Sequence, residues 1–202
     1  MKSNSLFINT ATKSLQFAIL SSSSFKSIDL GSSKKALENS FVGIEKLLSD
    51  ENLKFSDIDS FYTLLGPGSN TGIRLGLTIV RTVYGLNSAI NMYGINTLKV
   101  LLNDKDGLSL LSDRASNLFV GYYKNDEFVT EKVLKNDINS NKLFKDKTLY
   151  IDKADESSIE IFKEYSNKVL IDVIKNMVDK KDAFDNYSKR IDDYLPIYQF
   201  DI

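Results

Sequence analysis

The sequence predicts a mixed α/β protein built from two similar halves. Over the first half, short strand-like apolar runs alternate with longer segments of helical periodicity in the order β-β-β-α-β-α-β-α. A charged, turn-rich segment at 103–107 follows, and the strand pattern then starts again. We therefore expect a first sub-domain at 1–103 and a reduced second sub-domain at 104–202, whose tail at 191–202 packs back on the first.

The first half opens with three short strands that form an antiparallel meander. Ser32 and Ser33 then offer N-caps for a helix that reaches about Leu48. In that helix Leu37, Phe41, Ile44 and Leu48 form one apolar stripe. The expected elements, in order, are strands at 6–10, 15–20 and 25–30, a helix at 33–48, a strand at 61–65, a helix at 70–86, a strand at 89–93 and a helix at 97–102.

The second half is expected to repeat this architecture in shortened form. Strands are predicted at 108–111, 118–124, 128–134 and 148–151. A single long helix at 157–178 follows, because apolar residues recur there on one face. The segment 179–190 is rich in charge and is expected on the surface.

The composition excludes several classes of function. The 202 residues are 42% hydrophobic, enough for a substantial core. With 26 basic and 27 acidic residues, the composition gives no electrostatic argument for direct nucleic-acid binding, which needs a concentrated positive surface. The chain has no Cys and no His, so disulfides, thiolate catalysis and histidine-containing triads are excluded. No apolar run is long enough for a signal peptide or a membrane span, which predicts a cytoplasmic protein without a membrane partner.

The stretch from Phe61 to Leu86 contains a glycine-rich turn between a strand and a helix. Such a turn can bind an anion through free backbone N–H groups at the helix start. Candidates for a phosphate or nucleotide contact are Gly66, Gly68, Ser69 and Thr71. A P-loop would need Lys after its last glycine, but Ile73 follows Gly72, and the spacing of a dinucleotide fingerprint also fails. A purely structural turn is the favoured interpretation, and a nucleotide-binding module without chemistry stays open.

Small residues recur at helical spacing on both N-terminal helices. Ala36, Ser40, Gly43 and Leu47 form one such stripe, and Gly72 and Gly76 form the other. Small side chains allow another element to approach closely. Packing within the chain and contact with another protein both explain the pattern.

Four segments carry a resemblance to a known family. Gly66 to Leu77 reads GPGSNTGIRLGL and closely resembles the loop and helix of the TsaB (YeaZ) family. Leu6 to Ser14 (LFINTATKS) is similar to its opening strand and turn, Ser112 to Ala115 (SDRA) to its Asp-Ala-Arg segment, and Leu195 to Tyr198 (LPIY) to its C-terminal motif. The resemblance spans nearly the whole length of the chain.

The resemblance implies the actin-like nucleotidase (ASKHA) fold, with two ββαβα-type sub-domains on mixed sheets. It also implies a non-catalytic scaffold for a TsaD-type catalytic subunit, working with a TsaE-type ATPase in tRNA threonylcarbamoyladenosine synthesis. Self-association into a homodimer when alone and only indirect contact with tRNA are further implications. The helices at 33–48 and 70–86 would form the partner surface, through Ala36, Ser40, Gly43, Leu47, Gly72, Ile73, Gly76, Leu77 and Val80. ATP or ADP at a partner interface stays open, and no catalytic or metal-binding residue is assigned.

The departures from the family pattern bear on activity. Asn9 stands where the family has Asp, and an amide lacks the negative charge that Mg²⁺ prefers. Asn70 replaces a Phe in the loop. We therefore expect no enzymatic activity from the chain by itself. The alternatives are a stand-alone nucleotide-binding protein of this fold or a small-molecule kinase, against which Asn9 counts. A peptidase would need Ser69 or Thr71 as a nucleophile without an evident base.

Overall fold

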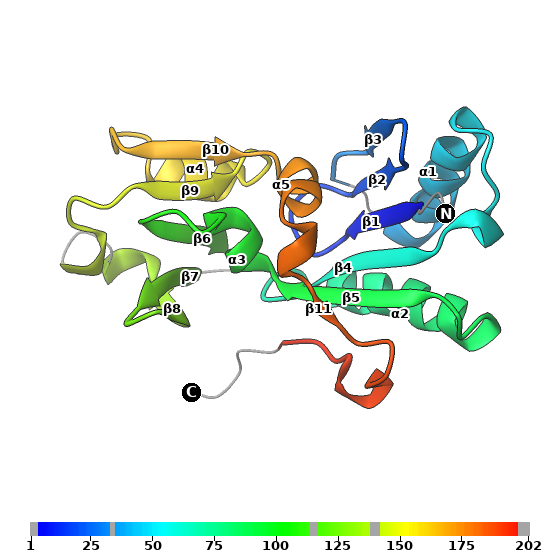
Figure 1. Cartoon of the computed structure of the whole chain (residues 1–202). Helices are drawn as coiled ribbons and strands as arrows, with labels where there is room; N and C mark the ends of the chain where they lie inside the picture. The colour runs from blue at the N-terminus through cyan, green and yellow to red at the C-terminus, as the bar shows by residue number, and fades with distance from the viewer. Residues whose placement is uncertain (1–3, 33–34, 114–116, 138–141, 198–202) are drawn as a thin grey trace.

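The computed structural model of the chain describes residues 4–32, 35–113, 117–137 and 142–197. Two mixed β-sheets stand side by side, with helices packed on their faces (Figure 1). The first half forms β1 (Ser5–Asn9), β2 (Gln16–Leu20), β3 (Phe25–Asp29), α1 (Ala36–Asp50), β4 (Ser60–Gly66), α2 (Asn70–Leu86), β5 (Asn91–Asn96) and α3 (Thr97–Leu102). The second half forms β6 (Leu108–Ser112), β7 (Asn117–Lys124), β8 (Glu127–Leu134), β9 (Leu149–Asp152), α4 (Glu156–Ile161), β10 (Lys168–Ile171), α5 (Val173–Asp179) and β11 (Asp185–Asn186).

The two halves share one sheet topology. Among the described residues, the first sheet has the order β11-β5-β4-β1-β2-β3 and the second has the order β10-β9-β6-β7-β8. In each sheet the leading strand of its half, β1 or β6, is antiparallel to the next strand and parallel to the fourth. The mixed α/β class and the repeated architecture predicted from the strand pattern are confirmed.

The helices α1 and α2 cover the same face of the first sheet. Ile8 pairs in register with Phe17 of β2 and with Thr63 of β4, so these three side chains point to one face. A Cβ atom at Gly43 of α1 would lie 3.3 Å from Cδ2 of Phe17, and one at Gly76 of α2 would lie 2.6 Å from Oγ1 of Thr63. The small residues therefore let both helices pack closely on the chain's own sheet.

Aromatic rings cover the opposite face of the same sheet. Phe7 of β1 stacks on Tyr62 of β4 with ring centroids 4.5 Å apart, and Tyr62 stacks on Tyr93 of β5 at the same distance. The edge of the Phe184 ring meets Tyr62 at 5.2 Å. Helix α5 also packs on this face, against β1 and β2 (Figure 1). The central strands β1, β2 and β4 are thus buried on both faces, which explains their mostly apolar sequences, whereas the edge strand β3 is largely exposed.

Helices α3 and α5 join the two halves. Helix α3 follows β5 and packs on the second sheet, against β6 and β7, whereas α5 follows β10 and packs on the first sheet, against β1 and β2. The two helices also contact each other, and Nδ2 of Asn176 donates a hydrogen bond to the carbonyl oxygen of Val100 (3.0 Å). The chain therefore passes between its sub-domains through a pair of adjacent helices.

The predicted single helix at 157–178 is wrong. The structure has α4, then a turn, then strand β10, and only then α5. Val169, Leu170 and Ile171 pair in parallel with β9, and Asp172 caps α5 by accepting a hydrogen bond from the Lys175 backbone N–H (3.5 Å). The apolar spacing at 159–173 matched a helix by chance, because a short apolar run does not distinguish a strand from a helix.

Two further expectations change in detail. Helix α1 begins at Ala36 with Lys35 as its N-cap residue, later than the predicted Ser32 or Ser33, of which Ser33 lies outside the described residues. The charged segment 179–190 is not wholly on the surface. Phe184 is buried, and β11 adds an antiparallel edge strand to β5.

The described part of the tail lies against the first sub-domain. The Tyr194 side chain is fully buried, and its hydroxyl donates to the carbonyl oxygen of Tyr93 (3.3 Å). The guanidinium of Arg81 in α2 donates to the Tyr194 carbonyl oxygen (2.7 Å), and the Ile197 N–H donates to the carbonyl oxygen of Leu65 (2.7 Å). Residues 198–202 lie outside the described part.

None of the helices that the described residues form is both long and apolar enough to cross a membrane.

Candidate functional site

The glycine loop, residues 66–72, packs against the β1–β2 loop, residues 10–15. Ser69 caps α2 by accepting a hydrogen bond from the Gly72 N–H (3.2 Å), and its own N–H donates to the Ala11 carbonyl oxygen (2.7 Å). A Cβ atom at Gly68 would lie 2.3 Å from that same oxygen, and one at Gly72 would lie 1.7 Å from the Thr10 carbonyl oxygen. Glycine is required at both positions because two backbones touch there.

A cavity of about 400 Å³ lies between the two sub-domains. Its walls are the β1–β2 loop, the glycine loop with the first turn of α2, the start of α1 and the end of β6. Of the four candidate anion-binding residues, Gly68, Ser69 and Thr71 line this cavity, whereas Gly66 does not. Gly66 instead faces the tail, where an added Cβ would lie 2.8 Å from the Ile197 carbonyl oxygen.

Asn9 is the centre of a buried polar network beside this cavity. Its Nδ2 donates to Oγ1 of Thr12 and to Oε1 of Gln16, each at 2.9 Å, and its Oδ1 accepts from the Thr12 N–H (3.3 Å). Gln16 extends the network, because its Nε2 donates a hydrogen bond to Oδ2 of Asp29 (2.8 Å). Asn9 thus uses both the donor and the acceptor of its amide to shape the β1–β2 loop, a role that a carboxylate could not fill.

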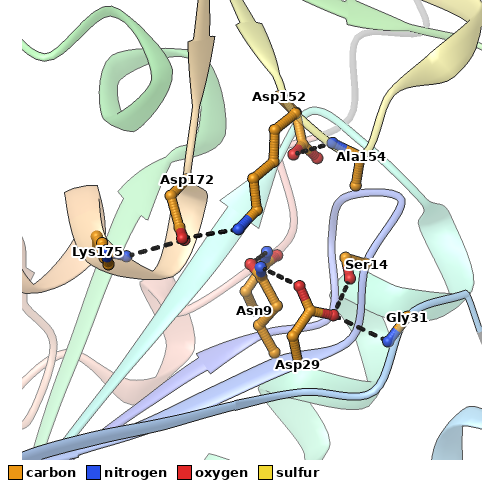
Figure 2. A network of polar contacts seen from close by, with 10 residues as sticks. Asn9, Ser14, Asp29, Gly31, Asp152, Ala154, Asp172 and Lys175 are labelled. Carbon is orange, nitrogen blue, oxygen red and sulfur yellow. Dashed lines mark hydrogen bonds and ion pairs between the residues drawn. The ribbon is translucent and has the colours of Figure 1, made fainter.

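Asp29 ends the network beside Ser14 and Gly31, both of which line the cavity (Figure 2). Its Oδ1 accepts from the Ser14 hydroxyl and from the Gly31 N–H (2.9 Å). Partial burial works against ionisation of Asp29, but the hydrogen bonds from Ser14, Gln16 and Gly31 together lower its pKa. The Asp29 carboxylate is therefore held charged at the edge of the first sub-domain.

The second sub-domain places Asp152 and Asp172 near this network (Figure 2), and Lys153 lies close enough to Asp29 for their charges to interact. The hydrogen bond between Nζ of Lys153 and Oδ2 of Asp172 (2.8 Å) raises the pKa of Lys153, to which the charge of Asp29 also contributes. Asp152, at the end of β9, is 1% exposed, and its burial raises the pKa of its carboxyl group. Sequence reasoning missed these residues, although Asp152 and Asp172 each follow directly on a short apolar run.

No group of three or more acidic residues among the described ranges is arranged to hold a metal ion. The described polar contacts in this region are instead ion pairs and hydrogen bonds from backbone N–H groups. Asp155 is an example, because its fully buried carboxylate accepts from the backbone N–H and the hydroxyl of both Ser112 and Ser158. Its role is to join β6 to the start of α4.

The predicted partner residues face mainly inward, which corrects the interpretation of the small-residue stripes. Gly43 and Gly76 contact the sheet as described above, and Ala36 is half-buried at the cavity. The other buried members of the predicted set are Ser40, Leu47, Gly72, Ile73, Leu77 and Val80. A bulky residue at Gly76 would therefore disturb the fold itself, so Gly76→Leu does not isolate a partner contact.

Other residues of α1 form an exposed apolar row. Leu37 is 55% exposed, Phe41 51% and Val42 64%. Glu38, Glu45 and Lys46 are also exposed and surround this row with charge. Sequence reasoning had placed Leu37 and Phe41 on the same stripe as Ile44 and Leu48, of which only the latter two are buried. The adjacent apolar residues Phe41 and Val42 could have indicated an exposed apolar surface from the sequence, because neighbouring residues point about 100° apart on a helix and one narrow face cannot bury both.

The fold and the cleft define the class: a protein of two duplicated sub-domains with an actin-like mixed-sheet topology and a cavity between them. Residues 31–180 match the protein family described as "TsaD: tRNA N6-adenosine threonylcarbamoyltransferase". The chain belongs to this family, and its resemblance to the TsaB (YeaZ) proteins is confirmed.

Similar solved structures share the fold over almost the whole chain. YeaZ from Pseudomonas aeruginosa superposes with a TM-score of 0.66 at 13% identity and covers 97% of this chain and 99% of its own. A crystal structure of "an uncharacterized protein with similarity to peptidase YEAZ from Pseudomonas aeruginosa" has a TM-score of 0.72 with the same identity and coverage. The filament protein AlfA from a B. subtilis plasmid has a TM-score of 0.51 at 9% identity, covering 88% of this chain and 99% of its own. These likenesses show the fold.

Two curated relatives are similar in sequence. "Uncharacterized protein MG208" of Mycoplasma genitalium is 29% identical over 121 residues, and its homolog in Mycoplasma pneumoniae is 26% identical over 121 residues. Each match covers 58% of this chain and 62% of the relative.

Proposed function

We propose that this chain is a non-catalytic partner subunit in the synthesis of tRNA N6-threonylcarbamoyladenosine. It binds a TsaD-type catalytic subunit, with a TsaE-type ATPase completing the complex, and contacts tRNA only through that complex. Membership of the family supports the pathway. The chain has no His, and a TsaD-type centre holds its metal through histidines, which favours the role of a non-catalytic subunit. The proposal places the chain in the cytoplasm.

The exposed row Leu37, Phe41 and Val42 on α1 is the observation that carries the proposal. Three large apolar side chains in a row on one helix are unfavourable in water and are typical of an interaction surface. The charged residues around them resemble the polar rim of a protein interface. We infer that the outward face of α1, with the exposed side of α2, is the partner surface. We thus keep the two helices that the sequence predicts as the partner surface, but we assign the contact to their exposed residues instead of the buried small-residue stripes.

Co-purification of this chain with the TsaD-type protein of its own genome tests the proposal. Phe41→Glu should abolish the complex, because it places a charge in the centre of the apolar row, while the melting temperature stays within about 1 °C because Phe41 is half exposed. Leu170→Glu is the matched control, since Leu170 is 50% exposed on β10 of the second sub-domain. Equal complex formation by wild type and Phe41→Glu would overturn the assignment of this surface.

The same surface accounts for a homodimer when the catalytic subunit is missing. We propose that two copies then cover their apolar rows against each other. Size-exclusion chromatography with light scattering should give a dimer for the wild type and a monomer for Phe41→Glu. A dimer that persists in this variant, while the heterodimer is lost, would separate the two interfaces.

The cavity favours nucleotide binding as a second candidate function. Its volume of about 400 Å³ and its glycine-loop wall suit a small phosphorylated ligand. Calorimetric titration with ATP and ADP tests this alternative, with Thr71→Arg as the variant that would fill the cavity from the start of α2. Saturable binding to wild type that Thr71→Arg removes would favour a nucleotide-binding module, and turnover by the chain alone would favour an enzyme.

A further inference from the structure

Strand β10 forms one edge of the second sheet. Among the described residues this sheet has the order β10-β9-β6-β7-β8, and β10 pairs in parallel with β9 on one side. In Figure 1 it is the upper border of the second sheet. An edge strand presents backbone N–H and C=O groups that a further strand can pair with. The second sheet can therefore be extended at β10.

The backbone of Leu170 points out of this edge. The Ile171 carbonyl oxygen accepts from the Lys153 N–H (3.0 Å), which shows that the backbone groups of Ile171 face the β9 side. Backbone groups alternate in direction along a strand, so those of Leu170 and of Lys168 face away from β9. Within the ranges that the structure describes, these outward groups have no hydrogen-bond partner. They are free to bind another chain.

The side chains at this edge are apolar and accessible. Val169 is 38% exposed and Leu170 is 50% exposed. Successive side chains of a strand lie on opposite faces of the sheet, so one of the two lies on each face. A strand that joined β10 would therefore gain an apolar contact on both faces in addition to its backbone hydrogen bonds.

The two charged residues that flank the edge are engaged inside the second sub-domain. Nζ of Lys168 donates to three carbonyl oxygens in the turn after α4, of which that of Lys163 is the nearest (2.6 Å). Asp172 binds Nζ of Lys153 (2.8 Å) and caps α5. Charged side chains on an edge strand normally discourage pairing with another chain. Here neither charge is available for that role.

The other sheet edges are protected by charge or by their shortness. Strand β3 carries Lys26, which is paired with Glu51 (2.8 Å), and β8 carries the exposed residues Glu127 and Glu131. Strand β11 is two residues long. Both devices are common ways in which sheet edges avoid pairing with other chains. Among the four edges in the described part of the chain, β10 is thus the apolar one without such protection.

We propose that β10 docks a short extended segment of another protein, which joins the second sheet as a further strand. The length of the edge favours a segment over a folded partner or a second copy of this chain. A stable association of two folded chains buries about 1,200 Å² or more. A four-residue strand with two exposed apolar side chains does not supply that area.

The edge also defines the chemistry of the segment. Main-chain hydrogen bonds to an edge strand supply affinity for any extended peptide, and the side chains on the two faces supply selectivity. Val169 and Leu170 lie on opposite faces, so the segment needs two consecutive apolar residues, one for each. Strand β9, which pairs with the other side of β10, shows this pattern at Tyr150 and Ile151.

The proposed docking edge is separate from the partner surface on α1. Strand β10 belongs to the second sub-domain, whereas α1 covers the first sheet. Leu170→Glu should therefore block the docking of a segment and leave the complex with the TsaD-type subunit intact. Phe41→Glu should have the opposite effect. The two assignments can thus fail independently.

A peptide that copies residues 148–153 of this chain (TLYIDK), acetylated and amidated at its ends, is the probe, because this sequence already pairs with β10 in the fold. In an NMR titration of the isotope-labelled protein, the amide signals of Lys168 and Leu170 should shift saturably. Their hydrogen exchange should slow by about tenfold. The amide signals of β8, a protected edge, should not move. No saturation up to about 2 mM peptide would overturn the proposal.

Leu170→Pro removes the outward N–H group and leaves the pairing of Ile171 with β9 in place. Proline is tolerated on an edge strand where the N–H faces solvent. This variant should bind the peptide at least about tenfold more weakly, with an unchanged far-UV circular dichroism spectrum. Leu170→Glu keeps the N–H group and is the second variant, in case proline disturbs the strand. Equal peptide affinity of wild type and both variants would overturn the proposal. Signals of β10 that shift with protein concentration alone would assign the edge to a second copy and overturn it as well.

Discussion

Gly72 of α2 lies directly against Thr10 of the β1–β2 loop. A Cβ atom at Gly72 would lie 1.7 Å from the Thr10 carbonyl oxygen, and the Thr10 hydroxyl donates to the Gly72 carbonyl oxygen (2.6 Å). Both residues line the cavity between the sub-domains. This single contact fixes the start of α2 against β1 and so sets the wall of the candidate site.

Gly72→Ala should therefore destabilise the protein by about 2–4 kcal/mol, because the backbone of the β1–β2 loop has to move. Gly85→Ala, in the last turn of the same helix, is the control. An added Cβ there meets nothing within 4 Å, so this change should be neutral or stabilise by up to about 1 kcal/mol. Urea denaturation measures both. Equal stability of the two variants would show that the Gly72 contact is not tight.

Asn9→Asp should lower stability by about 2–4 kcal/mol at neutral pH. A carboxylate cannot donate to Thr12 and Gln16, and it would be buried without a positive partner in direct contact. Urea denaturation at pH 5 and pH 8 measures the loss, which should be larger at pH 8, where the new carboxyl is charged. Asn9→Asp with wild-type stability would mean that the network tolerates a carboxylate and that the family residue was lost without structural consequence.

Asp29→Asn should make the protein less stable at neutral pH by about 1–2 kcal/mol, through weaker hydrogen bonds from Ser14, Gln16 and Gly31. Because the pKa of Asp29 is lowered in the folded protein, its contribution is present above the ordinary value of 3.8 and is lost as pH falls below it. The difference between variant and wild type should shrink on acidification. A difference that is constant with pH would contradict this role.

Arg81→Leu should loosen the tail. Its guanidinium donates to the carbonyl oxygens of Ile191 (3.2 Å) and Tyr194 (2.7 Å), and losing these bonds costs about 1.5–3 kcal/mol. Limited chymotrypsin digestion should then cut near Tyr194 at least tenfold faster than in wild type. Thr82→Ala, at the next and exposed position of α2, should leave the rate unchanged. Equal rates for Arg81→Leu and wild type would show that the burial of Tyr194 alone holds the tail.

Local patterns in the sequence were enough for most strands and for α2 and α3. Glycine, Ser69 and a long apolar run specified the turn and the start of α2 through local backbone preferences. The segment at 157–178 was misassigned, because the pairing of β10 with β9 depends on residues distant in sequence. Local patterns also could not decide which face of α1 is buried. The small residues and the large apolar residues each formed a stripe that could have packed on the sheet.

The sequence by itself determined the α/β class, the duplication of the architecture, the family resemblance and the absence of any His or Cys chemistry. These follow from composition and from short-range periodicity. Only the tertiary structure decided that Gly43 and Gly76 pack inward, that Leu37 and Phe41 face outward, and that Asp152 meets the β1–β2 loop. The physical reason is that burial is a property of the space between elements, and that space is set by long-range packing.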